Sequence, residues 1–198
     1  MKAQSWKRAK DSFEIESEAI KIASESINKE SFEKAVNILA KSVKVGTSGC
    51  GHSGIACQHF AHSLCCIEKP ARFISPSEAL HGAIGFIQKG DVMVLASRGG
   101  KTAELIPILE ICKEKGAKII TVTENFESTL AKESNVILPL KIKQESDKYN
   151  CQGTSSFIAL SAIFDALQVA LIEETGYSSD QFALIHPGGA VGERLNKK

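Results

Sequence analysis

The sequence lacks the features that mark nucleic-acid-binding, secreted and membrane proteins. Its 24 Lys and Arg residues nearly balance its 23 Asp and Glu residues, so the formal net charge of +1 gives no overall attraction to nucleic acid or membranes. No early apolar run is long enough for a signal peptide, and no later run approaches the span of a membrane helix. We therefore expect a cytoplasmic protein with a small-molecule partner, and neither nucleic acid nor a membrane as a partner.

The six cysteines also lack a pattern typical of disulfides or zinc sites. They lie mostly within apolar helical patterns of a chain without a secretory signal, which favours buried, reduced thiols. Cysteines and histidines gather in residues 50–66, but their spacing matches no common zinc signature. We predict no metal.

What the sequence does contain is an alternation of short apolar runs and amphipathic segments, in a length suited to one α/β domain. Five runs resemble buried strands: residues 43–46, 71–74, 92–96, 117–123 and 136–140. Helical patterns lie between them, and a strongly apolar helix is expected from about residue 154 to 174. This alternation predicts a doubly wound, five-stranded parallel sheet of order 2-1-3-4-5 flanked by helices.

We expect residues 1–198 to form a single domain. Residues 1–42 carry two amphipathic helical patterns and form an N-terminal helical extension, which serves as a lid or as a subunit contact. Residues 177–198 form a C-terminal segment that contains the sequence His-Pro-Gly-Gly. The sequence alone does not decide between the two roles of the extension.

A polar turn follows the third predicted strand, at residues 97–102. It combines the hydroxyls of Ser97 and Thr102 with Gly100 and Lys101, and it opens directly into an amphipathic helix. Free backbone N–H groups and the dipole at a helix N-terminus favour an anion, so the turn predicts a phosphate site. The alternative is an ordinary tight turn whose glycines serve backbone geometry alone.

A second glycine-rich turn follows the first predicted strand. Gly49, Gly51 and Gly54 fit the GxGxxG spacing of a dinucleotide fingerprint, but the second strand does not end in the acidic residue that the fingerprint requires. A dinucleotide-binding oxidoreductase stays an alternative on this motif alone. In a sheet of order 2-1-3-4-5, strands one and three meet where the strand order reverses, so both turns converge on one crevice.

Several motifs together resemble the sugar isomerase (SIS) domain. They are Gly46-Thr47-Ser48, Cys50-Gly51-His52-x-Gly54, Glu78-Ala79-x-His81-Gly82-x-x-Gly85, Ser97-x-x-Gly100-x-Thr102-x-Glu104, Thr154-Ser155-Ser156 and Phe182-Ala183-Leu184-x-His186-Pro187-Gly188-Gly189-Ala190-x-Gly192. In this order they are similar to the arabinose 5-phosphate isomerase branch, over nearly the whole chain. Members of that branch often carry a pair of CBS domains after the SIS domain, and this sequence stops where those would begin.

The resemblance implies catalytic roles for four positions. The family uses a Lys, two Glu and a His to open the sugar ring and move a proton between C1 and C2. Glu145 and His186 keep the family residues, whereas Gly49 and Lys101 stand at the other two positions. Lys101 supplies the cation that the first turn lacks, because both turns face one crevice. The alternatives are a solvated carboxylate for Glu145 and a backbone-bonding imidazole for His186.

The resemblance also implies a phosphosugar as the small-molecule partner and no cofactor. The expected substrate and phosphate ligands are Thr47, Ser48, Ser53, His81, Ser97, Gly100, Thr102 and Thr154.

We expect an aldose–ketose isomerase of the arabinose 5-phosphate/ribulose 5-phosphate type that works through an enediol. A homodimer or homotetramer is implied, in which the His segment of one subunit completes the site of another. The alternative function is a non-catalytic phosphosugar or nucleotide-sugar binding domain with a regulatory role.

Overall fold

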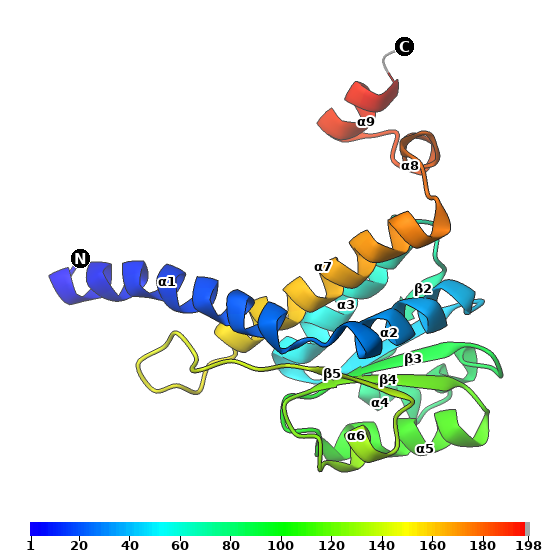
Figure 1. Ribbon diagram of the computed structural model, residues 1–198, viewed down its shortest axis with the longest axis horizontal. Helices are drawn as coiled ribbons and strands as arrows, with labels where there is room; N and C mark the ends of the chain where they lie inside the picture. The colour runs from blue at the N-terminus through cyan, green and yellow to red at the C-terminus, as the bar shows by residue number, and fades with distance from the viewer. Residues whose placement is uncertain (197–198) are drawn as a thin grey trace.

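The computed structural model describes residues 1–196 and contains a five-stranded parallel sheet (Figure 1). The strands are β1 (Val45–Gly49), β2 (Ala71–Phe73), β3 (Val92–Ala96), β4 (Lys118–Thr123) and β5 (Val136–Pro139). Their order is β2-β1-β3-β4-β5, and every neighbouring pair is parallel. The predicted fold class and strand order are confirmed. Residues 197 and 198 of the predicted C-terminal segment lie outside the described residues.

Helices cover both faces of the sheet. One face packs against α1 (Ala3–Ser26), α2 (Lys29–Lys41), α3 (Gly51–Cys65) and α7 (Ser155–Thr175). The other packs against α4 (Pro76–Ala79), the 3₁₀ helices η1 (Ala83–Phe86) and η2 (Ala103–Leu105), α5 (Ile106–Glu114) and α6 (Thr129–Lys132). Because successive side chains of a strand point to opposite faces, Val94 of β3 joins the first core while Met93 and Leu95 join the second.

The helix α7 corrects our expectation that no segment approaches a membrane span. By length and composition it is apolar enough to cross a membrane. In the structure it lies against α1, α2 and α3, and Phe164 stacks on Phe60 of α3 with ring centroids 4.4 Å apart. A core helix that packs against several neighbours needs the same apolar composition as a membrane-spanning helix, which explains why α7 is apolar enough to cross a membrane.

The first strand lies further along the chain than expected. We predicted residues 43–46, but β1 runs from Val45 to Gly49 and includes Thr47 and Ser48. Polar side chains are tolerated there because both hydroxyls donate to buried backbone carbonyls, of Cys57 and Ile74 respectively. The first helix of the N-terminal extension, α1, begins at Ala3.

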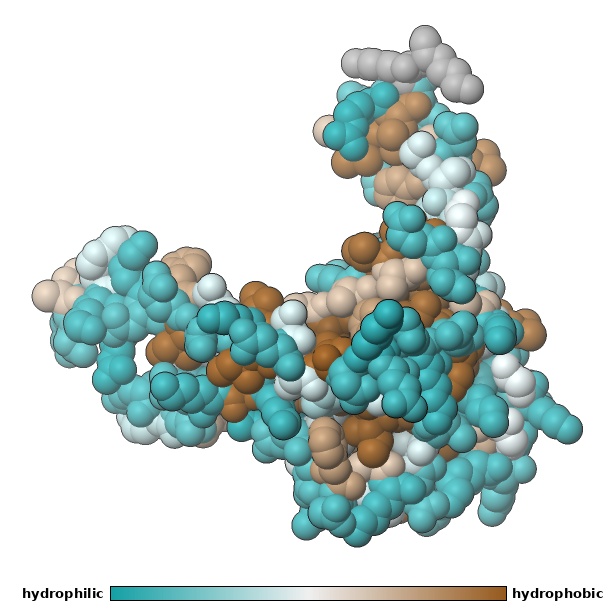
Figure 2. Space-filling model, viewed as in Figure 1, coloured by the Kyte–Doolittle hydropathy of each residue, from teal (hydrophilic) through white to brown (hydrophobic). Residues whose placement is uncertain are grey.

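Both ends of the chain project from the body of the domain. The N-terminal part of α1 extends to one side, and α8 (Ser179–Ile185) and α9 (Gly189–Asn196) lie beyond the C-terminal end of α7 (Figure 1). Figure 2 shows apolar surface on the body between these projections. A groove of about 360 Å³ lies there, lined by residues of α1, α2, α7 and the turn between α1 and α2, including Ile20, Ile27, Phe32 and Ile163.

Candidate functional site

The turn after β3 is a closed structure built on two hydroxyls. Ser97 and Thr102 place their hydroxyl oxygens 2.8 Å apart, and the Gly100 N–H donates to Ser97 Oγ at 3.0 Å. Gly100 has a φ of +65°, and a Cβ atom there would collide with the Ser128 side chain. The structure therefore brings together three of the predicted phosphate ligands, and the turn requires glycine at position 100.

The turn opens into a helix, as the sequence led us to expect. The 3₁₀ helix η2 begins directly after Thr102 and continues without a break into α5 at Ile106, so the first turn of this helix is 3₁₀ rather than α. A phosphate at this turn would therefore meet the polar groups of the turn and the N-terminus of η2. Lys101 lies at the exposed edge of the turn.

Two of the predicted ligands in the first turn are enclosed. Thr47 and Ser48 are fully buried, and their hydroxyls donate to the carbonyl oxygens of Cys57 and Ile74 at 2.8 and 2.7 Å. These bonds tie β1 to α3 and to the residue after β2. Both side chains thus support the crevice without lining its surface, whereas Ser53, on the first turn of α3, is partly exposed.

Gly49, at the position where the resemblance expects a lysine, has no room for a side chain. A Cβ atom would lie 2.9 Å from the backbone carbon of Ser53 and 3.0 Å from the backbone nitrogen of Gly54. The next residue, Cys50, does line a cleft. Burial, and then the nearby negative charge of Glu104, raise the pKa of the Cys50 thiol.

That cleft holds about 410 Å³ at the carboxyl ends of β1 and β2. Its polar lining includes Ser75 and Ser77, whose hydroxyl oxygens lie 2.9 Å apart, and Glu104. Our sequence reasoning did not select these residues, although the Ser-Pro-Ser run directly after the second strand is a signal for a polar crevice wall. His81 is exposed in the turn between α4 and η1.

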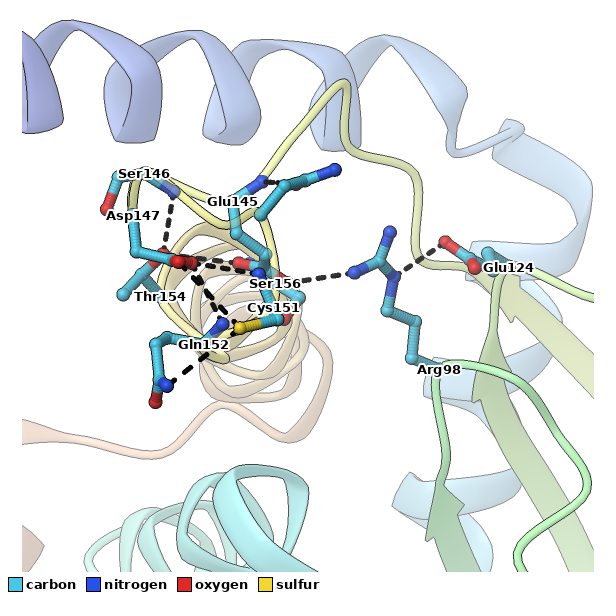
Figure 3. A network of polar contacts seen from close by, with 10 residues as sticks. Arg98, Glu124, Glu145, Ser146, Asp147, Cys151, Gln152, Thr154 and Ser156 are labelled. Atoms are coloured by element: carbon cyan, nitrogen blue, oxygen red, sulfur yellow. Dashed lines mark hydrogen bonds and ion pairs between the residues drawn. The ribbon is translucent and has the colours of Figure 1, made fainter.

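Glu145 is the best-defined polar group of the site (Figure 3). It is only 4% exposed, so the alternative of a solvated carboxylate is wrong. Its Oε1 accepts from Arg98 Nη1 at 2.9 Å, and its Oε2 accepts from the Ser156 N–H at 3.1 Å and from Thr154 Oγ1 at 3.3 Å. The carboxylate therefore caps the N-terminus of α7 by accepting the Ser156 N–H.

The loop from β5 to α7 is held in place by its own polar groups. Asn150 Oδ1 accepts from the Glu145 N–H at 2.6 Å, and the Ser146 N–H donates to Thr154 Oγ1 at 2.8 Å. The Asp147 carboxylate accepts backbone N–H groups, and the bond from Gln152 is the largest cause that lowers the Asp147 pKa. This loop thus presents Glu145 in one defined position.

His186 lies at the other end of α7. Glu145 contacts the first residues of α7, whereas His186 follows α8, beyond the last residue of α7 (Figure 1). A helix of 21 residues is roughly 30 Å long at 1.5 Å per residue. One chain therefore does not bring His186 to Glu145 and Lys101. The exposed imidazole stacks on Phe182, with ring centroids 4.9 Å apart.

The SIS domain family matches residues 38–170 of this chain. Among curated relatives, arabinose 5-phosphate isomerase KdsD of Pseudomonas aeruginosa is 39% identical over 165 residues, which are 83% of this chain and 51% of that protein. Arabinose 5-phosphate isomerase KpsF of Escherichia coli is 33% identical over 181 residues, 91% of this chain and 55% of that protein. The chain thus spans about half the length of the curated relatives that it matches.

Solved structures are similar over nearly the whole chain. A Listeria monocytogenes protein, with a proposed assignment as a sugar-phosphate isomerase, is 39% identical with a TM-score of 0.91, covering 95% of this chain and 100% of that one. An Escherichia coli CFT073 protein in complex with arabinose 5-phosphate is 28% identical with a TM-score of 0.88, covering 94% of this chain and 100% of that one.

Proposed function

Because the chain belongs to the SIS domain family, we propose that it is a phosphosugar aldose–ketose isomerase of the arabinose 5-phosphate/ribulose 5-phosphate type. The names of the curated relatives and the arabinose 5-phosphate complex of a similar structure support this substrate class. The observation that carries the proposal is the buried Glu145 carboxylate, joined through Arg98 to the turn of residues 97–102.

The reaction needs a base near C1 or C2, a group that opens the ring and a site for the phosphate. Glu145 is the proposed base, since its loop and the N-terminus of α7 hold it at one place. Ser97, Gly100 and Thr102 provide the phosphate turn. Lys101 is the proposed catalytic cation. We expect further substrate contacts from Ser53, His81 and Thr154. The proposed enediol chemistry needs no cofactor.

Ring opening requires His186 from a second copy of the chain, because its own copy holds it at the far end of α7. An apolar stripe on α1 offers a surface for that second copy. Trp6, Phe13 and Ile20, spaced seven residues apart, are 59%, 70% and 41% exposed. Such a repeated stripe on a projecting helix is typical of helix–helix association. We therefore propose a homodimer or homotetramer with shared sites.

We also propose a cytoplasmic location and a single domain over residues 1–198, with an extension at 1–42 and a His-containing segment at 177–198. All six cysteines are free, which is typical of a reducing compartment. The family match covers residues 38–170, which lie almost entirely between the proposed extension and the proposed His-containing segment.

Proton NMR of ribulose 5-phosphate with the protein in D₂O tests the activity. We expect an aldose product with deuterium at the exchanging carbon, and loss of both with Glu145→Gln. Turnover that survives in Glu145→Gln would remove Glu145 as the base.

A non-catalytic phosphosugar-binding domain is the second candidate, favoured by Gly49, whose position excludes the expected lysine. It predicts a thermal shift on adding the sugar phosphate, without product or deuterium exchange.

A further inference from the structure

Arg98 connects three loops at the carboxyl end of the sheet (Figure 3). It belongs to the turn after β3, and its Nε donates to Glu124 Oε2, after β4, at 2.8 Å. Its Nη1 donates to Glu145 Oε1, in the loop before α7, at 2.9 Å. The guanidinium thus lies between two carboxylates that come from different loops.

The backbone of Arg98 is fixed by the same neighbours. Its carbonyl oxygen accepts from the Glu124 N–H at 3.0 Å and from Thr123 Oγ1 at 2.9 Å. The side chain leaves this anchored backbone in the direction of Glu145 (Figure 3). The backbone end of the Arg98 side chain is therefore held in place, and the two ion pairs fix the orientation of its guanidinium.

Glu145 depends on this arrangement. A carboxylate that is 4% exposed has lost nearly all of its water, and an ionised group in such a place requires a charged partner. Arg98 is the cation that forms an ion pair with it among the described residues. The other contacts, from Ser156 and Thr154, both go to Oε2, so within residues 1–196 Arg98 alone contacts Oε1.

We propose that Arg98 is the positioning residue of this site, which holds the Glu145 carboxylate at the place where it removes the substrate proton. The inference rests on the proposed function. Arg98 directly follows Ser97 of the phosphate turn, so one short segment sets both the place of the phosphate and the place of the base. Lysine is a poor substitute, because a single ammonium lacks the planar fork that contacts Glu124 and Glu145 together.

This role predicts a specific kinetic defect. A base displaced by about 1 Å loses on the order of a hundredfold in rate, so Arg98→Ala lowers kcat about a hundredfold. KM for the phosphosugar stays within about threefold, because the ground-state contacts of the phosphate turn remain. Arg98→Lys recovers part of kcat, and Arg72→Ala, a change of an exposed arginine on β2, leaves both constants unchanged.

Chemical rescue separates positioning from a merely structural role. Arg98 is 38% exposed, so its truncation leaves a slot open to solvent. Millimolar guanidinium is expected to restore much of kcat to Arg98→Ala, whereas urea, which is neutral, restores none. The double variant Arg98→Ala/Glu145→Gln gains nothing from guanidinium, because the carboxylate that the cation orients is absent.

Two results would overturn the proposal: a raised KM with unchanged kcat in Arg98→Ala, which would make Arg98 a phosphate ligand, or equal recovery with urea and guanidinium. Failure of the proposed function gives a different result, namely a wild-type protein without turnover on pentose 5-phosphates.

In that case, hydrogen–deuterium exchange of residues 141–156 tests the placement of Glu145 without activity. Faster exchange in Arg98→Ala, reversed by guanidinium and not by urea, supports the role of Arg98, and unchanged exchange refutes it.

Discussion

Replacing Gly100 by alanine is expected to destabilise the protein and to open the phosphate turn. The residue has a φ of +65°, and an added Cβ would collide with Ser128, whose own Oγ donates to the carbonyl of Asn125. Ser128 also accepts from the Ala131 N–H and caps α6, so it is not free to move away. Neither the backbone nor the neighbouring side chain can relieve the contact.

The magnitude follows from two terms. A left-handed conformation costs an alanine roughly 1–2 kcal/mol, and overpacking costs roughly 1–3 kcal/mol. The lower entropy of alanine in the unfolded chain offsets about 0.4–1 kcal/mol. The expected net loss is about 2–4 kcal/mol, which corresponds to a fall in Tm of about 5–15 °C for a chain of this size.

The matched control lies one residue earlier. Gly99 is exposed, and a Cβ built there meets no atom within 4 Å. Gly99→Ala should therefore change the free energy of unfolding by less than about 0.5 kcal/mol. Urea titration followed by circular dichroism measures both variants. Equal stability of Gly100→Ala and Gly99→Ala would refute the steric argument for the turn.

Three further predictions concern the first turn and α1. Cys50→Lys should unfold near the wild-type Tm, because the side chain at position 50 faces the cleft. Gly49→Lys should lower the free energy of unfolding by more than about 2 kcal/mol, because a side chain at position 49 meets the backbone of α3. Equal losses of stability in the two variants would contradict this geometry. Because burial and Glu104 raise the pKa of the Cys50 thiol, less thiolate is present at pH 8 than in a free cysteine. Iodoacetamide labelling of Cys50, followed by mass spectrometry, should therefore quicken with rising pH and in Glu104→Gln, and an unchanged rate in that variant would exclude the charge effect. Phe13→Lys should lower the mass measured by light scattering toward the monomer, and an unchanged oligomer would exclude the α1 stripe as the interface.

The fold could be predicted because its main signals are local. The apolar run of β3 is continuous, and this is the pattern of a strand covered on both faces. The alternation of strands and helices indicated a doubly wound parallel sheet, for which 2-1-3-4-5 is a common strand order. The boundaries of β1 could not be predicted, because the carbonyls that satisfy Thr47 and Ser48 belong to residues 57 and 74.

The candidate site was predicted less completely, because its contacts connect residues distant in sequence. Glu145 was chosen from a resemblance, but its burial depends on Arg98, 47 positions earlier. Its alternative, a solvated carboxylate in a polar connector, followed from local composition alone. Likewise, the sequence motif around His186 did not reveal that α7 separates it from Glu145 within one chain.

Mixing two inactive variants tests the shared site most directly. Glu145→Gln and His186→Ala are each expected to lack isomerase activity on ribulose 5-phosphate. Each variant is expected to fold and to keep one of the two catalytic side chains. If each site takes its base from one copy and its imidazole from another, random exchange of subunits after mixing restores about a quarter of the wild-type activity. No recovery in mixed oligomers, or full activity of His186→Ala alone, would contradict the account.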